Sequence, residues 1–370
     1  MEKEKQGQEG KRKWFTKQLM GWNRKTNDRA MPWKGIKNAY FIWLSEIILQ
    51  QTRVEQGLPY YEKFTTAYPT VRDLANAPEE EVLKLWEGLG YYSRARNLHA
   101  AAKYIAEELN GVFPSTHSEI LKLKGVGPYT AAAIASFAFD LPHAVLDGNV
   151  FRVLSRFFGI ETFIDSTEGK KEFTKLADDL IDVKLPAAYN QAIMDFGATQ
   201  CTPAKPLCMF CPLQENCVAY TTGKTAELPI KGKKMKRRNR YFYYLVIETE
   251  KGIYLNKRTQ KDVWQDLYDF PLIESPTPID SSSIKKAIKE EWLAEGFKIE
   301  GYSKPIKHLL THQCIFGVFV KVKSIKNKVV FHEKKIKRLE LTAHPTAFPL
   351  PKLMVLFFKN HLKSDFYKKN

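Results

Sequence analysis

Hydrophobic residues recur at helical intervals through the first 220 residues of the chain. Over 71–89 the apolar positions follow roughly the spacing of one buried helix face: Val71, Leu74, Ala75, Val82, Leu85, Trp86 and Leu89. Turn chemistry interrupts the helical pattern at Asn110-Gly111 and again at Gly-Val-Gly-Pro over 125–128. Long strand-like alternation is absent from 14–222, so the pattern predicts a mainly helical region there.

A different pattern begins near residue 225. Seven of the ten residues in 231–240 are Lys or Arg and show no apolar period, which predicts a linker whose charge could also follow a phosphate backbone. Beyond it, we predict strands over 241–248, 252–256 and 312–323, with helices over 281–294 and 346–361. The chain is therefore expected to have a helical domain over 1–223, a basic linker over 224–240 and an α+β domain over 241–370.

The charge is distributed unevenly between these parts. The chain of 370 residues carries a net charge of +17; residues 1–223 are nearly neutral at +1, and residues 224–370 carry +16. Such an excess of positive charge favours a polyanionic partner, most simply nucleic acid, although a basic enzyme without one is the alternative.

The chain ends and the cysteine count indicate the compartment. The first 13 residues are charged and lack the apolar core of a secretion signal, and the longest apolar run, 131–139, is too short to span a bilayer. Five cysteines are too few and too clustered for a disulfide framework. We expect a cytoplasmic protein in a reducing environment, with no membrane partner.

Four of the cysteines have the spacing of a metal-binding loop. They follow the pattern C-x6-C-x2-C-x5-C: Cys201, Cys208, Cys211 and Cys217. Four thiolates suit an iron–sulfur cubane or a tetrahedral zinc ion, and four unligated cysteines are the remaining alternative. The spacing resembles that of the endonuclease III family of DNA repair glycosylases. The resemblance implies a 4Fe-4S cluster in a loop that contacts DNA.

The segment 121–133 combines a glycine turn with a following helix. Gly125 and Gly127 permit a tight turn, and Pro128 suits the first turn of a helix whose free N–H groups can bind an anion. Alone, this is as often an ordinary turn; beside the cysteines, it resembles a helix-hairpin-helix that holds DNA phosphate. Related enzymes that also cut the DNA backbone carry a nucleophilic Lys two residues after the second glycine. Here Tyr129 stands there, which favours base removal without strand cleavage.

Two carboxylates are candidates for the chemistry. Asp147 directly precedes an apolar helix, where it can cap the helix, lie beside a reacting sugar, or do both. Glu46 has the mostly apolar helical neighbours Ile42, Trp43, Leu49 and Gln50, which raise the pKa of a carboxyl and would suit a general acid. From the residues alone, a solvated or structural Glu46 is equally acceptable.

A more specific resemblance covers about residues 14–217. Met31-Pro32-Trp33, WLSEIILQQTRV over 43–54 and GLGYYSRARNLH over 88–99 are similar to adenine DNA glycosylases of the MutY type, which remove adenine mispaired with 8-oxoguanine. The resemblance implies that Glu46 protonates adenine and that Asp147 stabilises the sugar cation. It also implies ordering residues (Tyr129, Asn149), a base pocket (Arg29, Met31, Trp33, Gln191) and residues that enter the duplex (Gln51, Tyr91). Without it, Trp33 and Tyr91 would be core aromatics and Gln51 a surface residue.

The second half is similar to the same family more weakly, through VWQDLYDFP over 263–271 and HLLTHQ over 308–313. The resemblance implies a Nudix-like domain that recognises 8-oxoguanine. The glutamate-rich R-E-x-x-E-E box is absent, so nucleotide hydrolysis is not expected. The reading loop, often Phe-Ser-His in the family, is Leu310-Thr311-His312, and Ala39 replaces a frequent proline. Cys314 is expected to be packed rather than reactive.

These observations together predict a mainly α helix-hairpin-helix glycosylase domain with an iron–sulfur loop, followed by an α+β Nudix-like domain. The expected protein is a monomeric, nucleoid-associated adenine glycosylase acting on double-stranded DNA with 8-oxoguanine:A or G:A mispairs. The alternatives are an endonuclease III-like pyrimidine glycosylase with lyase activity and a non-enzymatic iron–sulfur DNA-binding protein.

Overall fold

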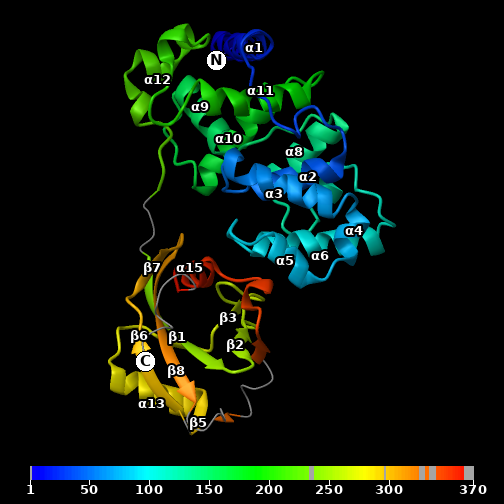
Figure 1. The fold of residues 1–370 in the computed structure, drawn as a ribbon. Coiled ribbons are helices and arrows are strands. Elements are labelled where there is room, and N and C mark those ends of the chain that lie inside the picture. The colour runs from blue at the N-terminus through cyan, green and yellow to red at the C-terminus, as the bar shows by residue number, and fades with distance from the viewer. Residues whose placement is uncertain (1, 233–236, 296, 325–329, 333–338, 362–370) are drawn as a thin grey trace. The chain divides into compact units, whose positions relative to one another are not determined.

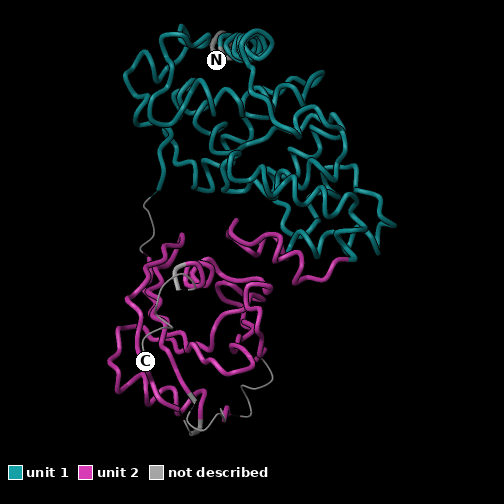
Figure 2. The backbone as a smooth tube through the Cα atoms, in the orientation of Figure 1, with its two compact units in different colours: residues 1–76, 97–233 teal, residues 77–96, 234–370 magenta. Residues whose placement is uncertain are grey.

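The computed structural model describes residues 2–232, 237–295, 297–324, 330–332 and 339–361. The chain forms two compact units, residues 1–76 with 97–233 and residues 77–96 with 234–370 (Figure 2). Residues 77–96 therefore belong to the second unit, although the residues before and after them in the sequence belong to the first. No helix of the described residues is long and apolar enough to cross a membrane.

The first unit is built from helices, as the hydrophobic periodicity predicts (Figure 1). Its longer helices are α1 (Glu2–Lys25), α2 (Ala39–Leu49), α3 (Val54–Ala67), most of α6 (Ser93–Glu107), α8 (Pro128–Phe139), α9 (Gly148–Phe158), α10 (Thr167–Leu180) and α11 (Pro186–Thr199). The short ones are α4 (Val71–Asn76), α7 (His117–Ile120), η1 (Cys208–Phe210), η2 (Gln214–Asn216), α12 (Val218–Thr221) and η3 (Lys224–Ala226).

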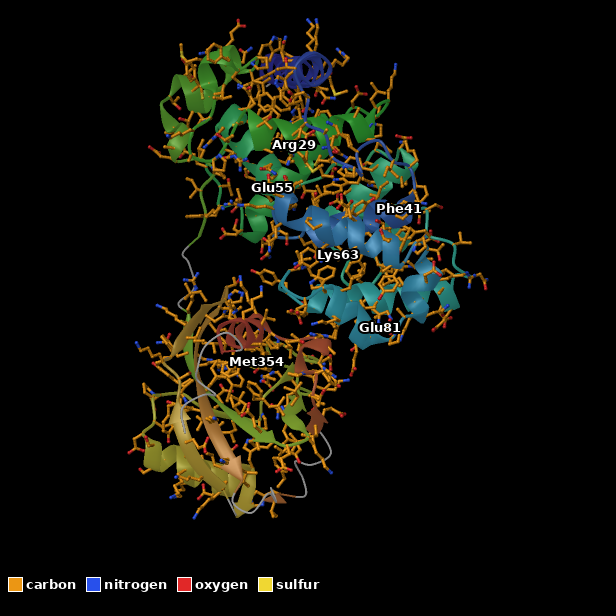
Figure 3. The ribbon with its side chains drawn as sticks, in the orientation of Figure 1. Arg29, Phe41, Glu55, Lys63, Glu81 and Met354 are labelled. Carbon is orange, nitrogen blue, oxygen red and sulfur yellow. The ribbon has the colours of Figure 1, made fainter. Side chains whose placement is uncertain are left out.

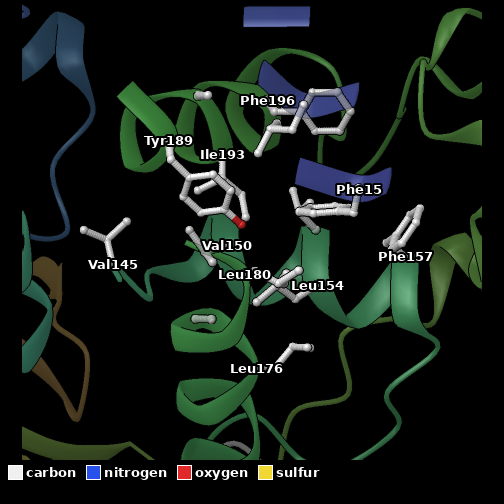
Figure 4. Packing of buried hydrophobic residues seen from close by; sticks show 14 of the residues in the cluster. Phe15, Val145, Val150, Leu154, Phe157, Leu176, Leu180, Tyr189, Ile193 and Phe196 are labelled. Carbon is white, nitrogen blue, oxygen red and sulfur yellow. The ribbon is translucent and has the colours of Figure 1, made fainter. Parts of the chain in front are cut away.

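A buried cluster joins α1, α9, α10 and α11, and Figure 4 shows its side chains interdigitating. Phe15 of α1 packs against Phe157 of α9 at a centroid distance of 4.8 Å, and Trp22 of α1 meets Phe196 of α11 edge-on at 4.9 Å. This core fixes the start of α9 relative to α11, and both helices carry candidate site residues.

The periodic stretch 71–89 differs from a single helix. It forms α4, which ends at Asn76, and α5 (Glu79–Leu85), which belongs to the second unit. Pro78 takes an extended conformation as the N-cap of α5, because proline cannot donate the backbone hydrogen bond that would continue a helix through it.

Among the described residues, eight strands of the second unit form one mixed sheet, in the order β10-β2-β1-β8-β6 with β3, β4 and β7 added at β2, β1 and β8. The strands are β1 (Arg238–Thr249), β2 (Gly252–Lys257), β3 (Tyr268–Asp269), β4 (Leu272–Ser275), β6 (Phe297–Tyr302), β7 (Ile306–Leu309), β8 (Gln313–Ser324) and β10 (Leu339–Thr342). β1 and β8 run parallel over eleven pairs, from Arg238–Gln313 to Glu248–Lys323. β5 (Leu293–Glu295) and β9 (Val330–Phe331) pair separately.

The two faces of this sheet bury alternate residues of β1. Tyr243, Leu245 and Ile247 pack in one cluster with Ile284 and Ile288 of α13 (Ser281–Glu291). Tyr244 belongs to the other set of alternate positions. Its ring stacks on Phe319, and Phe319 stacks on Phe357 of α15 (Lys352–His361) at a centroid distance of 4.0 Å. The short η5 (Pro345–Ala347) precedes α15. The predicted α+β architecture of the second half is therefore confirmed.

Candidate active site

A cavity of about 850 Å³ lies in the first unit, where the end of α2 meets the starts of α8 and α9 and one side of α11. The structure brings nine of the sequence-predicted residues to its wall: Arg29, Met31, Trp33, Glu46, Gln51, Tyr129, Asp147, Asn149 and Gln191. Figure 3 labels Arg29 and Glu55, which both line this cavity. These residues come from five separate stretches of the chain, so only the tertiary structure assembles them.

Glu46 is a buried carboxyl on the cavity wall. It lies on α2, which Asn38 caps by accepting hydrogen bonds from the backbone of Tyr40 and Phe41; Ala39 occupies the first helical position, where proline would also fit. Burial raises the pKa of Glu46 from 4.5 to about 7, a hydrogen bond from Tyr129 opposes the rise, and the charge of Asp147 adds to it. A carboxyl of this kind is half protonated near neutral pH and can donate a proton.

Tyr129 is held beside Glu46 by the start of α8, where Pro128 occupies the first turn. Its hydroxyl lies 3.4 Å from the sulfur of Met194 and is also a hydrogen-bond partner of the Glu46 carboxylate. Burial and the two nearby carboxylates raise the pKa of Tyr129 well above 10. The phenol therefore stays protonated and can only orient or donate to its neighbours.

Asp147 caps α9, as its position before an apolar helix predicts. Its Oδ1 accepts hydrogen bonds from the backbone N–H groups of Asn149 and Val150 at 2.9 and 2.8 Å, and its Oδ2 accepts one from Asn149 Nδ2 at 2.8 Å. Burial raises the pKa of Asp147, while these hydrogen bonds and Arg152 hold it down. The helix N-terminus thus fixes a carboxylate that faces the cavity.

Arg152, one turn further along α9, connects this corner to the cysteine loop. Its guanidinium donates to Asn149 Oδ1 at 2.8 Å, to the carbonyl of Gly197 at 2.6 Å and to the carbonyl of Cys201 at 2.8 Å. Sequence reasoning missed Arg152, although its spacing of three from Asn149 places the two on the same helix face.

The cysteine loop itself is held by a second arginine of α9. Arg156 donates to Leu228 O, Thr202 O and Pro203 O at 3.0, 2.8 and 2.9 Å, and its Nη1 lies 3.4 Å from Cys201 Sγ. The guanidinium therefore ties the start of the loop, and Leu228 beyond its end, to α9. The charge of Arg156 also opposes the rise that burial causes in the pKa of Cys208.

The four thiols are neighbours in this loop. Burial raises the pKa of Cys211, and Cys201, Cys217 and Cys208 raise it further through repulsion between their charged forms. Within the described residues, no three His, Cys, Asp or Glu side chains are arranged to hold one metal ion.

Arg29 lines the cavity and owes its orientation to Asp195 of α11, which is fully buried. The carboxylate accepts from Arg29 Nη1 at 2.8 Å, from Asn27 Nδ2 at 3.0 Å and from Lys34 Nζ at 3.2 Å. Asp195 is a second residue that sequence reasoning missed, because its partners lie more than 160 positions away.

Backbone geometry singles out two of the predicted DNA contacts in this unit. Gln51, at the cavity mouth, has φ of +55°, a conformation that costs energy for a residue other than glycine. Gly125 has φ of +82°, and a Cβ there would meet Asn97 at 2.7 Å. Gly127 differs: it caps α8 with φ of −97°, and a Cβ there would meet no protein atom within 4 Å. The outer side of the hairpin is therefore open to a ligand.

The remaining predicted residues lie in the second unit. Leu310, Thr311 and His312 form the turn between β7 and β8, and Tyr91 belongs to the 77–96 segment of the same unit. The Tyr91 hydroxyl lies 2.6 Å from Thr311 Oγ1, and Tyr91 has φ of +48°. Cys314 is buried in β8, as expected.

Comparisons with known proteins agree with this geometry. Residues 44–179 match the model of the HhH-GPD superfamily base excision DNA repair proteins. An adenine DNA glycosylase of Buchnera aphidicola subsp. Acyrthosiphon pisum is 30% identical over 96% of this chain and 92% of its own length. The Homo sapiens adenine DNA glycosylase is 43% identical over 55% of this chain and 39% of its own length.

Among solved structures, a thermostable thymine-DNA glycosylase matches with a TM-score of 0.54 and 31% identity, over 58% of this chain and 98% of that one. The resemblance inferred from the sequence motifs is thus confirmed. Because relatives at 30% identity or more extend over nearly the whole length of both proteins, the chain belongs to the adenine DNA glycosylase family of the HhH-GPD superfamily and is a DNA glycosylase of base excision repair.

Proposed function

We propose that this glycosylase hydrolyses the N-glycosidic bond of adenine paired with 8-oxoguanine or guanine in double-stranded DNA. The observation that carries the proposal is the pair Glu46 and Asp147 on the wall of one cavity. Burial raises the pKa of both carboxyls, but Glu46 is buried and its pKa rises to about 7, whereas Asp147 is half-buried and accepts three hydrogen bonds that favour its charge. Such a difference assigns an acid role to one carboxyl and an anionic role to the other.

In the proposed mechanism, adenine leaves the base stack and enters the cavity, whose volume of about 850 Å³ accommodates a base and its sugar. Glu46 protonates the base, and the bond to C1′ breaks through an oxocarbenium-like sugar. Asp147 stabilises that cation and assists the attack of water. Tyr129 and Asn149 hold the two carboxyls in place. Arg29, Met31, Trp33 and Gln191 form the walls that orient the base.

The proposed reaction ends with base removal and does not include strand cleavage. A lyase step needs an amine to form a Schiff base with C1′, and none of the described residues lining the cavity is a lysine. At the position two residues after Gly127 stands Tyr129, whose phenol stays protonated. We therefore infer a monofunctional enzyme, and we propose separately that it acts as a monomer.

Four thiolates are the donor set of a 4Fe-4S cluster as well as of a tetrahedral zinc ion. The other three thiols raise the pKa of Cys211, so the four lie close together in the loop. The resemblance of their spacing to the endonuclease III family favours a 4Fe-4S cluster. When bound, it would shape the loop and could carry an electron; Arg156 and Arg152 attach that loop to α9.

The second unit is proposed to read the base opposite adenine. Oxidation of guanine converts the N7 acceptor into an N–H donor, which the hydroxyl of Thr311 can accept. Leu310 supplies an apolar wedge without ring stacking, and His312 and Tyr91 adjoin the same turn. Gln51, Gly125 and Gly127 of the first unit would contact the duplex. The boundaries at 223 and 241 remain predictions, as does the Nudix-like nature of 241–370.

A single-turnover assay tests this function. Duplexes with one 8-oxoguanine:A, G:A or G:T pair are incubated with excess protein and then treated with or without hot alkali. We expect loss of adenine from the first two duplexes and strand cleavage only after alkali. Glu46→Gln should lower the rate by about 10²–10⁴-fold, the usual range for a general acid. Glu55→Gln is the matched control, because Glu55 lines the same cavity but is exposed.

Three results would contradict parts of the proposal. Cleavage without alkali would indicate lyase chemistry of the endonuclease III type. Removal of thymine but not adenine would show that the cavity accepts thymine, the base in the name of the thymine-DNA glycosylase that shares this fold. Equal rates for Glu46→Gln and Glu55→Gln would remove the acid role from Glu46. A non-enzymatic DNA-binding protein, which the cysteine pattern left open, is already excluded by membership of the glycosylase family.

A further inference from the structure

The turn between β7 and β8 presents the residues proposed to read the lesion. Thr311 and His312 are exposed at its tip, and the turn is closed by a hydrogen bond from Leu310 N–H to the carbonyl of Gln313 at 2.9 Å. This closing bond does not involve the carbonyls of Leu310 and His312, the residues on either side of Thr311. Their support comes from the start of β1.

Two successive arginines bind the two carbonyls on either side of Thr311. The Nε of Arg237 donates to Leu310 O at 3.0 Å, and the backbone N–H of Arg238 donates to His312 O at 3.0 Å. The side chain of one residue and the main chain of the next therefore hold both ends of the tip. The side chain of Arg237 is exposed. Its orientation is therefore not fixed by packing but by its hydrogen bond to the turn.

A third arginine holds the base of the same turn. The side chain of Arg240 is 5% exposed and makes five hydrogen bonds: two to Glu274, two to Asp262 and one, of 3.0 Å, to Oε1 of Gln313. All five N–H donors of the guanidinium are thus used. The carboxylates of Asp262 and Glu274 fix the orientation of the guanidinium. The guanidinium in turn holds the side chain of Gln313, the residue after His312.

We propose that Arg237 and Arg240 are positioning residues for the turn 310–313, and that they set how well this glycosylase distinguishes 8-oxoguanine from guanine. The inference rests on the proposed reading role of Thr311. Discrimination between an N–H and a lone pair at N7 depends on where the hydroxyl oxygen lies, and a recognition group must be held to within about 0.5 Å to act. Arg237 and Arg240 of the basic segment 231–240 thus position the protein's own backbone. From its charge alone, this segment would be expected to contact DNA phosphate.

The chain supplies a matched pair of variants. Arg237→Ala removes one charge and the hydrogen bond to Leu310 O. Arg238→Ala removes the same charge one residue later but keeps the backbone bond to His312, and Arg238 is also exposed. Gln313→Met removes the Arg240 contact while leaving the ion pairs of Arg240 with Asp262 and Glu274, so the second unit retains its buried charge network.

The first measurement is the ratio of single-turnover rates on 8-oxoguanine:A and G:A duplexes. We expect Arg237→Ala and Gln313→Met to lower this ratio by about tenfold, the size typical of losing one hydrogen bond from a charged group. Arg238→Ala should keep the ratio of the unaltered chain. Both arginine variants should weaken duplex binding equally at low salt, because each loses one charge.

The second measurement is hydrogen–deuterium exchange of the amides of 309–314 in the DNA-free chain. Arg237→Ala should exchange faster there, and Arg238→Ala should match the unaltered chain. Identical ratios and identical exchange in the two arginine variants would overturn the proposal. A different outcome would separate the two proposals. If Arg237→Ala exchanges faster but the unaltered chain acts equally fast on both duplexes, the positioning role of Arg237 stands and the proposed recognition of 8-oxoguanine by Thr311 is refuted.

Discussion

We predict that the protonation of Glu46 sets the pH dependence of adenine removal. The pKa of this carboxyl is raised from 4.5 to about 7, chiefly by burial. If the protonated form delivers the proton, its population is about one half at pH 7, about one tenth at pH 8 and about one hundredth at pH 9. The single-turnover rate should therefore fall about fivefold from pH 7 to pH 8 and about tenfold for each further pH unit.

Tyr129→Phe is the perturbation that tests the cause of this profile. The Tyr129 hydroxyl bonds the charged form of Glu46 and lowers its pKa, so removing the hydroxyl should raise the pKa. A hydrogen bond to a charged group contributes about 1.5–3 kcal/mol, and one pH unit corresponds to about 1.4 kcal/mol. The alkaline limb should therefore move upward by about one pH unit or more.

The assay measures single-turnover rates from pH 5.5 to 9.5 for the unaltered chain, Tyr129→Phe, Glu46→Gln and the control Glu55→Gln. We expect the limb to be absent in Glu46→Gln and unmoved in Glu55→Gln. A limb that survives in Glu46→Gln, or one that moves to lower pH in Tyr129→Phe, would refute the assignment of the acid.

The same shift makes Glu46 costly for stability. Because the pKa of Glu46 is higher in the folded chain than in the unfolded chain, its protonated form contributes to the free energy of unfolding. This contribution is fully present below pH 4.5 and is lost as pH rises through about 7. The difference corresponds to about 3 kcal/mol at alkaline pH. Glu46→Gln should therefore unfold at a higher temperature than the unaltered chain at pH 8, and the gap should close toward pH 4.5.

Three further substitutions follow from the contacts around the cavity. Arg152→Lys keeps a charge but loses the planar fork that reaches Cys201 O, so we expect single-turnover rates to fall about tenfold or more with the far-UV circular dichroism unchanged. Gly127→Ala should leave the melting temperature unaltered, because its Cβ would meet no protein atom, yet weaken duplex binding about tenfold in fluorescence anisotropy if phosphate approaches there. Asp195→Asn should lower the free energy of unfolding in urea by about 1–3 kcal/mol, less than for a fully buried pair because Arg29 is partly exposed, and slow adenine removal. An Asp195→Asn variant with unchanged rate would separate Arg29 from base recognition.

Most of the fold could be predicted from the sequence, because its signals are local. Apolar spacing predicts the helices of the first unit, and aromatic and β-branched runs predict β1, β2 and β8. Pro78 shows the limit of periodicity: the apolar pattern of 71–89 continues across it, but the missing backbone donor ends the helix. The strand β1 also begins at Arg238, inside the predicted linker, because pairing with β8 extends it backwards.

The candidate site was accessible from sequence only where a motif identified it. Glu46, Tyr129 and Asp147 each lie in a recognisable stretch, and the cavity contains all three. Arg152 and Asp195 carry no such mark. Their hydrogen-bond partners Gly197, Cys201 and Arg29 are 45, 49 and 166 positions away, and ordinary charged residues on a helix have the same appearance.

Neighbouring residues alone are sufficient to specify the Asp147 cap, the glycine turn of the hairpin, the spacing of the cysteines and the charge of the second half, since each of these features is local. Only the packed structure reveals that burial raises the pKa of Glu46 to about 7, that Tyr91 contacts Thr311 across 220 positions, and that Arg237 and Arg240 hold the turn 310–313. A pKa shift or a long-range hydrogen bond depends on burial and on the distance between groups. Both quantities exist only after helices and strands have packed together.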